Sequence, residues 1–250
     1  MTNIILCGCN GKMGKVVSGI VSERDDCKIV AGVDINTEST GYPVFDSFKN
    51  LSVQGDVIID FSHPATLDSI CEYIEKTGTP AVLTTTGYSA EQVEKIKALA
   101  TKAPIFFSFN MSLGINLLIE LAKKATCVLG DTFDIEIIEA HHNQKIDAPS
   151  GTAVMISEAI KESLCDAEYH EVYDRHSVRQ KRNQKEIGMH AIRGGTIVGE
   201  HTVMFAGHDE IVSISHSARS KEVFASGAVK AAVFMVGKPA GLYAMKDMIK

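Results

Sequence analysis

The sequence predicts an α/β protein with an N-terminal domain built on a parallel sheet, plus an α+β domain whose sheet is mixed and largely antiparallel. Three observations support this prediction. Short apolar runs alternate with helical patterns over residues 3–108, as expected of parallel strands joined by crossover helices. A glycine-rich turn follows the first apolar run. Apolar and polar residues then alternate over residues 187–217, as in antiparallel strands with one buried face.

The composition is that of a globular protein. The 250 residues are 45% hydrophobic and 22% charged, enough for one large domain or two small ones. The net charge of −6 argues against a nucleic-acid partner. The basic run over residues 175–185 lacks interleaved aromatic residues and is typical of a solvated loop or an interface segment. No apolar run approaches the roughly 20 residues of a membrane span, so no membrane partner is expected.

The cysteines predict reduced thiols and a cytoplasmic protein. They show no CxxC pair and no disulfide-like spacing, and several fall within apolar segments. The chain enters its first strand at once, without the pattern of a signal peptide. The cysteines are Cys7, Cys9, Cys27, Cys71, Cys127 and Cys165.

The pattern of residues 3–34 predicts a Rossmann-type unit. A strand over residues 3–7 leads into Gly8-Cys-Asn-Gly-Lys-Met-Gly14, a helical run over 15–22 and a second strand over 28–33. Asp34 then lies 20 residues beyond Gly14, where such a unit places the carboxylate that binds the adenosine ribose. The glycine spacing is looser than GxGxxG, so a βαβ unit without a nucleotide is the alternative. Asp34 should repel a 2′-phosphate and Lys12 should offset that repulsion, which leaves NADH against NADPH open.

Further strands are expected at residues 56–60, 80–83 and 104–108, with helices from Pro64 to about residue 77 and over 90–101. Small polar residues follow each of these strands. Because parallel strands end at one edge of the sheet, we expect them to line a nicotinamide site there. Turn chemistry alone is the simpler explanation for each one.

The middle of the chain has a different pattern. A helix is expected over residues 112–128, a strand over 133–138 and a helix over 153–164. Strands over 187–192, 196–205 and 210–217 should be antiparallel neighbours, joined by short turns at 193–195 and 207–209. A last helix over 221–236 can return to the first domain, before a short terminal helix. We therefore expect a dinucleotide-binding domain at residues 1–111 and 219–250, and a substrate-binding and oligomerisation domain at 112–218.

The loop between residues 138 and 153 gathers ionisable groups at a helix start. Ser150 stands where an N-cap is expected, so Gly151 and Thr152 should form a first turn whose N–H groups have no earlier helix carbonyl as acceptor and suit a carboxylate or phosphate. His141, His142 and Lys145 lie close by in the sequence as proton donors. An ordinary capped helix after a surface loop is the alternative. Arg193, in a glycine turn, is either a carboxylate clamp or an exposed hairpin residue.

Several motifs together resemble the 4-hydroxy-tetrahydrodipicolinate reductase family, also called dihydrodipicolinate reductase, of the diaminopimelate and lysine pathway. The most specific is Glu139-Ala-His-His-Asn-Gln-Lys-Ile-Asp-Ala-Pro-Ser-Gly-Thr-Ala153. The resemblance continues through Gly8 to Gly14, Asp60 to Pro64, Thr85 to Gly87, Asn110 to Asn116, Ile197 to Thr202 and Gly237 to Tyr243. It therefore covers nearly the whole chain. Thr84 departs from it, because a glycine is common there.

The resemblance implies a homotetramer that reduces 4-hydroxy-tetrahydrodipicolinate, a small dicarboxylate, to tetrahydrodipicolinate with NADH or NADPH, and no metal. It assigns proton transfer to His141 and Lys145, and substrate binding to His142, Gly151 and Thr152, to which we add Arg193. It assigns the cofactor to Gly8, Cys9, Asn10, Gly11, Lys12, Met13, Asp34, Thr84, Thr85, Thr86, Ser108, Phe109, Asn110 and Met111.

Three other functions remain open from the sequence. One is another two-domain nicotinamide-dependent dehydrogenase acting on a small carboxylated substrate, such as an aspartate or homoserine dehydrogenase. A second is a metallohydrolase that uses His141 and His142, although the HExxH spacing is missing and Lys145 would oppose a cation. A third is a non-catalytic NAD(H) sensor, which would need neither the proton donors nor the anion site.

Overall fold

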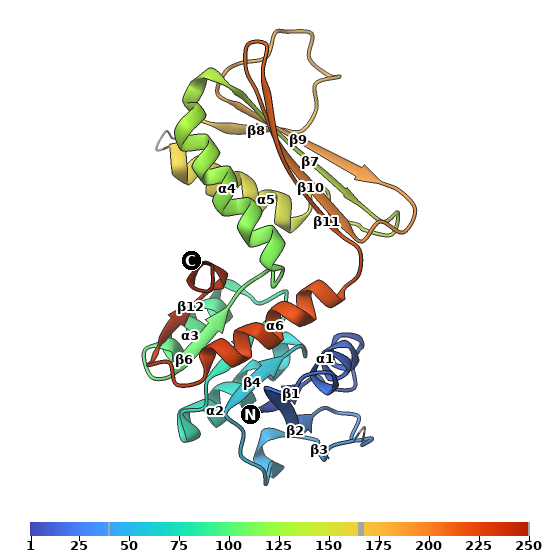
Figure 1. Ribbon diagram of the computed structural model, residues 1–250, viewed down its shortest axis with the longest axis vertical. Coiled ribbons are helices and arrows are strands. Elements are labelled where there is room, and N and C mark those ends of the chain that lie inside the picture. The colour runs from blue at the N-terminus through green and yellow to red at the C-terminus, as the bar shows by residue number, and fades with distance from the viewer. Residues whose placement is uncertain (40, 165–167, 250) are drawn as a thin grey trace. The chain divides into compact units, whose positions relative to one another are not determined.

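The computed structural model describes residues 1–39, 41–164 and 168–249. The chain divides into two compact units (Figure 1). The first contains Met1–Leu113 and Lys221–Lys250, and the second contains Gly114–Ser220. Among the described residues, no helix has the length and apolar character needed to cross a bilayer.

The first unit is built on a seven-stranded sheet in which every pairing is parallel. The strand order is β12-β6-β5-β4-β1-β2-β3. The strands are β1 (Thr2–Cys7), β2 (Cys27–Val33), β3 (Val44–Phe45), β4 (Val57–Asp60), β5 (Ala81–Leu83), β6 (Pro104–Phe107) and β12 (Gly241–Tyr243). This confirms the predicted Rossmann-type sheet.

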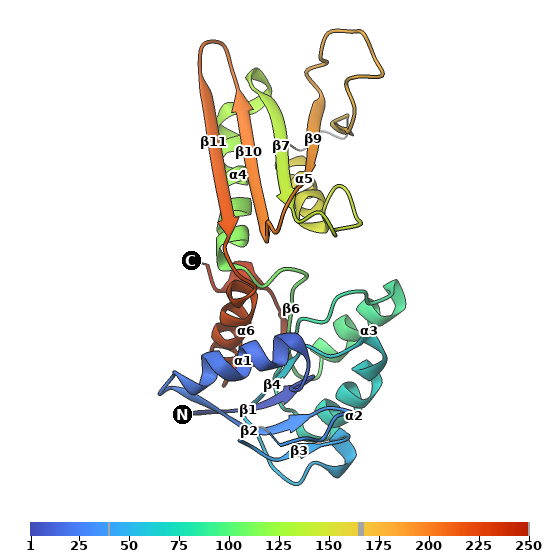
Figure 2. The same cartoon turned by 90° about the vertical axis from the view of Figure 1, so that its right-hand side faces the viewer.

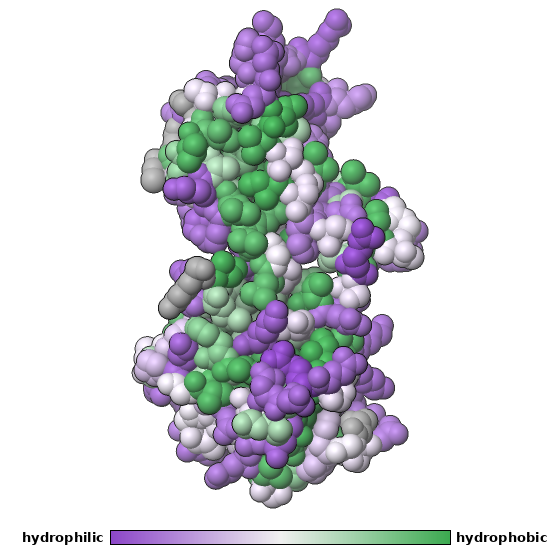
Figure 3. Space-filling view, in the orientation of Figure 1, coloured by the Kyte–Doolittle hydropathy of each residue, from purple (hydrophilic) through white to green (hydrophobic). Residues whose placement is uncertain are grey.

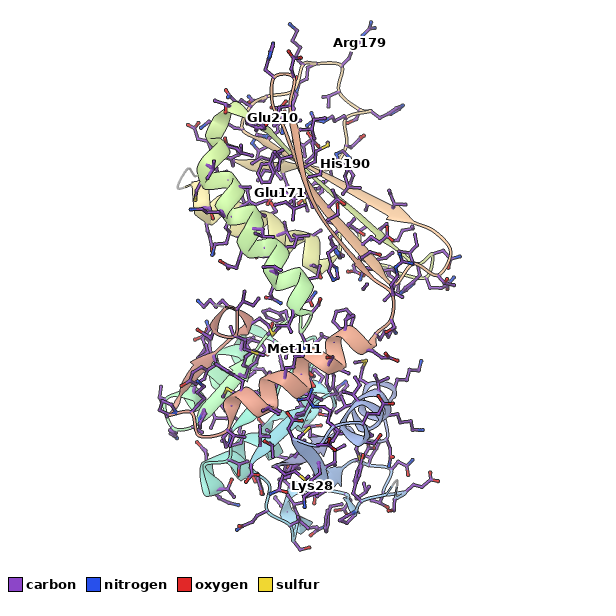
Figure 4. All side chains as sticks on the ribbon, in the orientation of Figure 1. Lys28, Met111, Glu171, Arg179, His190 and Glu210 are labelled. Atoms are coloured by element: carbon purple, nitrogen blue, oxygen red, sulfur yellow. The ribbon has the colours of Figure 1, made fainter. Side chains whose placement is uncertain are left out.

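Helices cover both faces of this sheet, which is why its strands are continuously apolar. Helices α1 (Lys12–Ser22) and α6 (Glu222–Met235) pack on one face, and α2 (Leu67–Thr77) and α3 (Ala90–Ala100) pack on the other. Figure 2 shows the two helix layers. Met111 lies against α6 (Figure 4). Its carbonyl oxygen comes so close to Gly227 that a side chain at position 227 would collide with it.

The second unit has a mixed five-stranded sheet in the order β11-β10-β7-β9-β8. Its strands are β7 (Asp134–His141), β8 (His170–Val172), β9 (Glu186–Arg193), β10 (Gly199–Ala206) and β11 (Ile211–Ala218). Helices α4 (Leu113–Leu129) and α5 (Gly151–Leu164) cover one face, over a core that includes Ile137, Val203 and Phe205. The outer side of α4 exposes Leu117, Leu121 and Val128, which form hydrophobic surface along that helix in Figure 3.

The predicted hairpin between β9 and β10 was wrong. β7 lies between them, parallel to β9 and antiparallel to β10. The connection after Arg193 therefore crosses the end of β7, where Gly194 N–H donates to the His141 carbonyl at 2.9 Å and Asn143 N–H donates to Gly195 at 3.2 Å. β7 gains a partner on each edge in this way, and alternation alone does not reveal which strands are neighbours.

Other departures concern element ends and very short strands. β7 runs three residues further than expected and reaches His141, and α1 begins at Lys12. β3, β8 and β12 were missed because two or three residues carry almost no periodic signal. The segment Gly241–Tyr243 pairs in parallel with β6, and in the described residues a 3-10 turn at Met245–Asp247 stands where a short terminal helix was expected.

The cysteine prediction holds for most of the thiols. Cys7, Cys9, Cys27 and Cys71 are free and buried, whereas Cys127 is free and exposed. Burial raises the pKa of the Cys9 thiol to about 11, so this thiol is protonated at neutral pH. Cys165 lies outside the described residues.

Two glycines of α1 give a test of the turn geometry. A Cβ on Gly14 would collide with the carbonyl oxygens of Gly8 and Cys9, whereas a Cβ on Gly19 meets nothing within 4 Å. We expect Gly14→Ala to lower the free energy of unfolding by about 2 kcal/mol or more through overpacking. Gly19→Ala should raise it by roughly 0.5 kcal/mol, because alanine favours the helix. Urea titration measures both, and equal effects would contradict this account.

Candidate active site

The residues predicted to bind a cofactor all lie at the carboxyl ends of neighbouring strands in the first unit. The turn at residues 8–13 follows β1, Asp34 follows β2, residues 84–86 follow β5 and residues 108–111 follow β6. In the sheet these strands are β6, β5, β1 and β2, with only β4 inserted between β5 and β1. The sheet order therefore brings these segments to one edge of one unit.

The glycine-rich turn has the form of a phosphate cradle. Gly8 has φ +77°, and a Cβ there would lie 2.6 Å from the Phe61 carbonyl oxygen. Gly11 is the N-cap of α1 and supplies no side-chain cap, so the first-turn N–H groups are left for an anion. The site thus offers the donors and the backbone approach that a dinucleotide pyrophosphate needs.

Asp34 ties this turn to the end of β2. One carboxylate oxygen accepts the Asn10 N–H at 2.9 Å and the other accepts the Asn36 N–H at 3.0 Å. The Asn10 amide in turn donates to the carbonyls of Asn36 and Glu38. A carboxylate has about four lone-pair positions, so Asp34 keeps acceptor capacity for the hydroxyls of a ribose.

Not every predicted cofactor residue has an accessible side chain. Cys9 and Met111 are only 1% and 3% exposed and belong to the core, which leaves their backbone groups for a cofactor. Phe109, in contrast, is 62% exposed. The Ser108 hydroxyl donates to the Asn110 carbonyl and shapes the turn after β6.

Asp60, at the end of β4, organises the loops around it. It is fully buried and accepts hydrogen bonds from the Ser62 N–H at 3.1 Å, the Thr85 hydroxyl at 2.8 Å and the Tyr88 hydroxyl at 3.0 Å. Burial, followed by the charge of Asp60, raises the pKa of Tyr88 well above its usual range. The Thr84 hydroxyl donates to the Asp60 carbonyl. The hydroxyls of Thr84 and Thr85 therefore hold the loop after β5 in place.

A second cluster, which we call the β7-end cluster, lies in the second unit and consists of Glu139, His141, Ser150, Arg193 and His201. Glu139 is 1% exposed and accepts the Arg193 fork at 2.8 and 2.7 Å, His141 Nδ1 at 2.6 Å and the Ser150 N–H at 3.0 Å. Burial alone would raise the pKa of Glu139, but these hydrogen bonds outweigh it and lower that pKa below its usual value.

His201 forms the other side of the β7-end cluster. Its ring packs edge-on against His141 with centroids 5.2 Å apart, and its Nε2 lies 3.1 Å from the Ser150 hydroxyl oxygen. That hydroxyl also accepts the Ala153 N–H, which confirms Ser150 as the N-cap of α5. Burial, with a smaller contribution from His141, lowers the pKa of His201 to about 4. His201 is therefore neutral at physiological pH.

Of the two predicted proton donors, His141 belongs to this cluster and Lys145 lies in the loop that follows it. His141 ends β7 and Lys145 follows in the loop, where its ammonium pairs with Asp147 at 2.8 Å and lowers the pKa of that carboxyl. Gly151 begins α5, and the space beside its Cα is open. The Arg193 fork binds Glu139, a carboxylate of the protein itself. Among the described residues, no three His, Cys, Asp or Glu side chains gather as metal ligands would.

Two family models match nearly all of the chain. The model for the N-terminus of dihydrodipicolinate reductase matches residues 2–111, and the model for its C-terminus matches residues 114–249. The chain belongs to the dihydrodipicolinate reductase family.

Relatives within the family support this assignment along the whole chain. The 4-hydroxy-tetrahydrodipicolinate reductase of Caldanaerobacter subterraneus subsp. tengcongensis is 49% identical over 250 residues, covering 100% of this chain and 99% of that protein. The reductase of the same name from Clostridium novyi is 49% identical, with the same coverage.

Solved structures share the fold. Dihydrodipicolinate reductase from Paenisporosarcina sp. TG-14, solved with dipicolinate bound, aligns with a TM-score of 0.82 at 24% identity over 100% of both chains. Aspartate dehydrogenase from Thermotoga maritima aligns with a TM-score of 0.53 at 12% identity, over 96% of this chain and 98% of that one. At these identities the likeness concerns the fold alone.

Sequence reasoning gave no role to four residues that the structure places at these sites. Glu139 and His201 belong to the β7-end cluster, and Asp60 and Tyr88 hold the loops after β4 and β5. A signal existed for two of them. Asp60 is a carboxylate at the end of an apolar strand, and Glu139 lies two residues before His141, hence on the same face once the strand is known to continue. No local pattern identifies His201 or Tyr88.

The His201 environment predicts an acid-dependent loss of stability. The unfolded chain binds a proton at this histidine near its ordinary pKa of 6.5, whereas the folded chain does so only near 4. Its stabilising contribution is therefore full above pH 6.5 and falls as the pH drops towards 4. Between pH 7.5 and 5.0 we expect wild type to lose about 2 kcal/mol of unfolding free energy more than His201→Gln. Exposed His208→Gln is the control and should keep the wild-type dependence; identical slopes in all three proteins would contradict the prediction.

Proposed function

We propose that this chain reduces 4-hydroxy-tetrahydrodipicolinate to tetrahydrodipicolinate, a step of diaminopimelate and lysine biosynthesis, with NADH or NADPH. Its family membership supports the reaction. The observation that carries the proposal in the structure is the start of α5. There a helix N-terminus suited to a carboxylate adjoins an imidazole that can transfer protons.

The first unit holds the cofactor in this proposal. The N–H groups at the start of α1 bind the pyrophosphate, Asp34 binds the adenosine ribose, and the segments after β5 and β6 surround the nicotinamide. A bound nicotinamide cofactor supplies the hydride. Asp60 would act through the loops that it holds, because its carboxylate accepts hydrogen bonds from Ser62, Thr85 and Tyr88.

The second unit binds and protonates the substrate. The first-turn amides at Gly151 and Thr152 receive one substrate carboxylate, and His142 and Lys145 add positive or donor groups around it. The 4-hydroxyl of the substrate leaves as water, which gives the conjugated dihydrodipicolinate ring. Addition of a hydride to this ring leaves an electron pair that must take up a proton. His141, or Lys145, provides that proton, so one hydride and one proton complete the two-electron reduction.

The sheet face opposite α4 and α5 supports assembly into a homotetramer. Along each strand, the residues between those of the core point to this face. Four of them lie side by side on the neighbouring strands β11, β10, β7 and β9: Ser215, Thr202, Ile138 and His190. His190, on β9, is labelled in Figure 4. No helix of the described residues covers this face, whereas the other face carries α4 and α5. A broad, mixed sheet face of this kind suits pairing with a second copy.

The proposed chemistry is tested by loss of proton transfer. We expect wild type to oxidise NADH or NADPH in the presence of the freshly generated dihydrodipicolinate precursor. His141→Ala and Lys145→Ala should each lower kcat about 100-fold or more, with cofactor affinity unchanged. Lys161→Ala is the control: it removes the ion pair between Lys161 on α5 and Glu171, in the same unit, and should keep wild-type kcat. A folded wild type that does not oxidise the cofactor with this substrate would refute the proposed reaction.

The assembly proposal has a separate test. Thr202→Glu places a charge in the middle of the open sheet face, where it would be desolvated on association. We expect sedimentation velocity to show smaller species than wild type at the same concentration. Lys124→Glu, on the exposed side of α4, introduces the same side chain elsewhere and should leave the wild-type mass unchanged. A wild type that sediments as a single 27.0 kDa chain would contradict the tetramer.

A further inference from the structure

Glu139 is a carboxylate only 1% exposed, in contact with the proposed proton donor His141. It lies on β7 two residues before His141, so both side chains point to the same face of the sheet. The strand register places His201 directly opposite Glu139, and Arg193 directly opposite His141. Three strands thus contribute to one contact group around a single carboxylate.

The contacts of Glu139 determine which nitrogen of His141 carries a proton. The hydrogen bonds from Arg193 and Ser150 keep Glu139 ionised, and an ionised carboxylate only accepts hydrogen bonds. The His141 atom that lies 2.6 Å away is Nδ1, so Nδ1 carries the hydrogen. The remaining nitrogen, Nε2, lies beside Gly199, where a Cβ would come within 3.1 Å of it. The missing side chain at Gly199 leaves space at that nitrogen.

We propose that Glu139 is a positioning residue for the reaction: it holds His141 as the Nδ1–H tautomer, so that Nε2 exchanges the proton, and it ties this imidazole to the carboxylate-binding start of α5. The second link is the hydrogen bond from the Ser150 N–H, the residue that caps α5. The inference rests on the proposed function, because it assigns a geometry to the proton transfer named there.

Arg193 limits how strongly Glu139 acts on His141. Its fork neutralises much of the carboxylate charge, and its remaining contacts are the Ile192 and Asp147 carbonyls. The ring of His201 on β10, which is neutral, packs against His141, and the loop after β7 carries the Lys145–Asp147 ion pair. Removing Glu139 should therefore disfavour protonated His141, whereas removing the Arg193 charge should favour it.

The chain contains a matched control on the same strand. Glu136 lies on the opposite face of β7 and accepts hydrogen bonds from His190 Nε2 at 2.7 Å and from Arg182 at 3.0 Å. It thus reproduces the carboxylate, imidazole and guanidinium group of the β7-end cluster without His141 or α5. A glutamine at either position removes a half-buried or buried negative charge from a similar network.

The test compares Glu139→Gln, Arg193→Gln and Glu136→Gln in the full-length protein. In Glu139→Gln we expect kcat to fall at least 10-fold, with the KM for NADH or NADPH unchanged. We also expect the limb of the kcat–pH profile that reports protonation of His141 to move to lower pH by about one unit. In Arg193→Gln the same limb should move up. Glu136→Gln should keep the wild-type limb. Opposite shifts are not expected of residues that only stabilise the fold, so shifts of one sign, or no shifts, would overturn the proposal.

A second readout needs no substrate and separates this inference from the proposed function. Nitrogen NMR of 15N-histidine protein, assigned with His141→Ala, reports the tautomer of His141 directly. We expect Nδ1–H in wild type and in Glu136→Gln, and a mixture of tautomers in Glu139→Gln. A wild-type His141 protonated at Nε2 alone would overturn the positioning role even if the enzyme is active. An inactive wild type with Nδ1–H would instead refute the reaction and retain the tautomer assignment.

Discussion

β7 is paired on both edges over residues 135–140 and with β9 as far as His141, and its end carries the β7-end cluster. Because it stays extended to His141, residues 139 and 141 share a face, and residues from β9 and β10 lie opposite them. The Gly194–Gly195 turn crosses this end and hydrogen-bonds the first residues of the loop. If residues 139–141 formed a loop instead of the end of β7, Glu139 would have no defined partner. A buried carboxylate without a partner is strongly destabilising.

In the proposed function, each unit would bind an anion in the same way, at the start of a helix that follows a strand. α1 begins after Gly11 without a side-chain cap, and α5 begins at Gly151 with Ser150 as its cap. In α1 the glycines admit the backbone close to a phosphate. In α5 the capping residue Ser150 is hydrogen-bonded to Glu139 and His201. Glu139 therefore contacts both the start of α5 and the imidazole of His141.

Most of the fold could be predicted because long elements carry strong periodic signals. The Rossmann-type strands, the position of Asp34 and the helix start at Ser150 all follow from local pattern. The pairing of β7 with β9 could not, since alternation gives the face of a residue and never the neighbour of a strand. The role of Arg193 depends on that pairing: its fork binds Glu139 only because β9 lies beside β7. His201 is invisible for the same reason, as it faces Glu139 from a strand 62 residues later in the chain.

In the proposed function, a cofactor held by the first unit would supply the hydride and the second unit would supply the proton, and the side chains of the two units match that division. The cofactor residues of the first unit offer backbone N–H groups, hydroxyls and the carboxylate of Asp34, and its buried Asp60 is satisfied by neutral donors. The second unit gathers His141, His201 and Lys145 at one strand end. Of these, burial keeps His201 neutral and an ionised carboxylate orients His141, so the two adjacent imidazoles lie in chemically different surroundings.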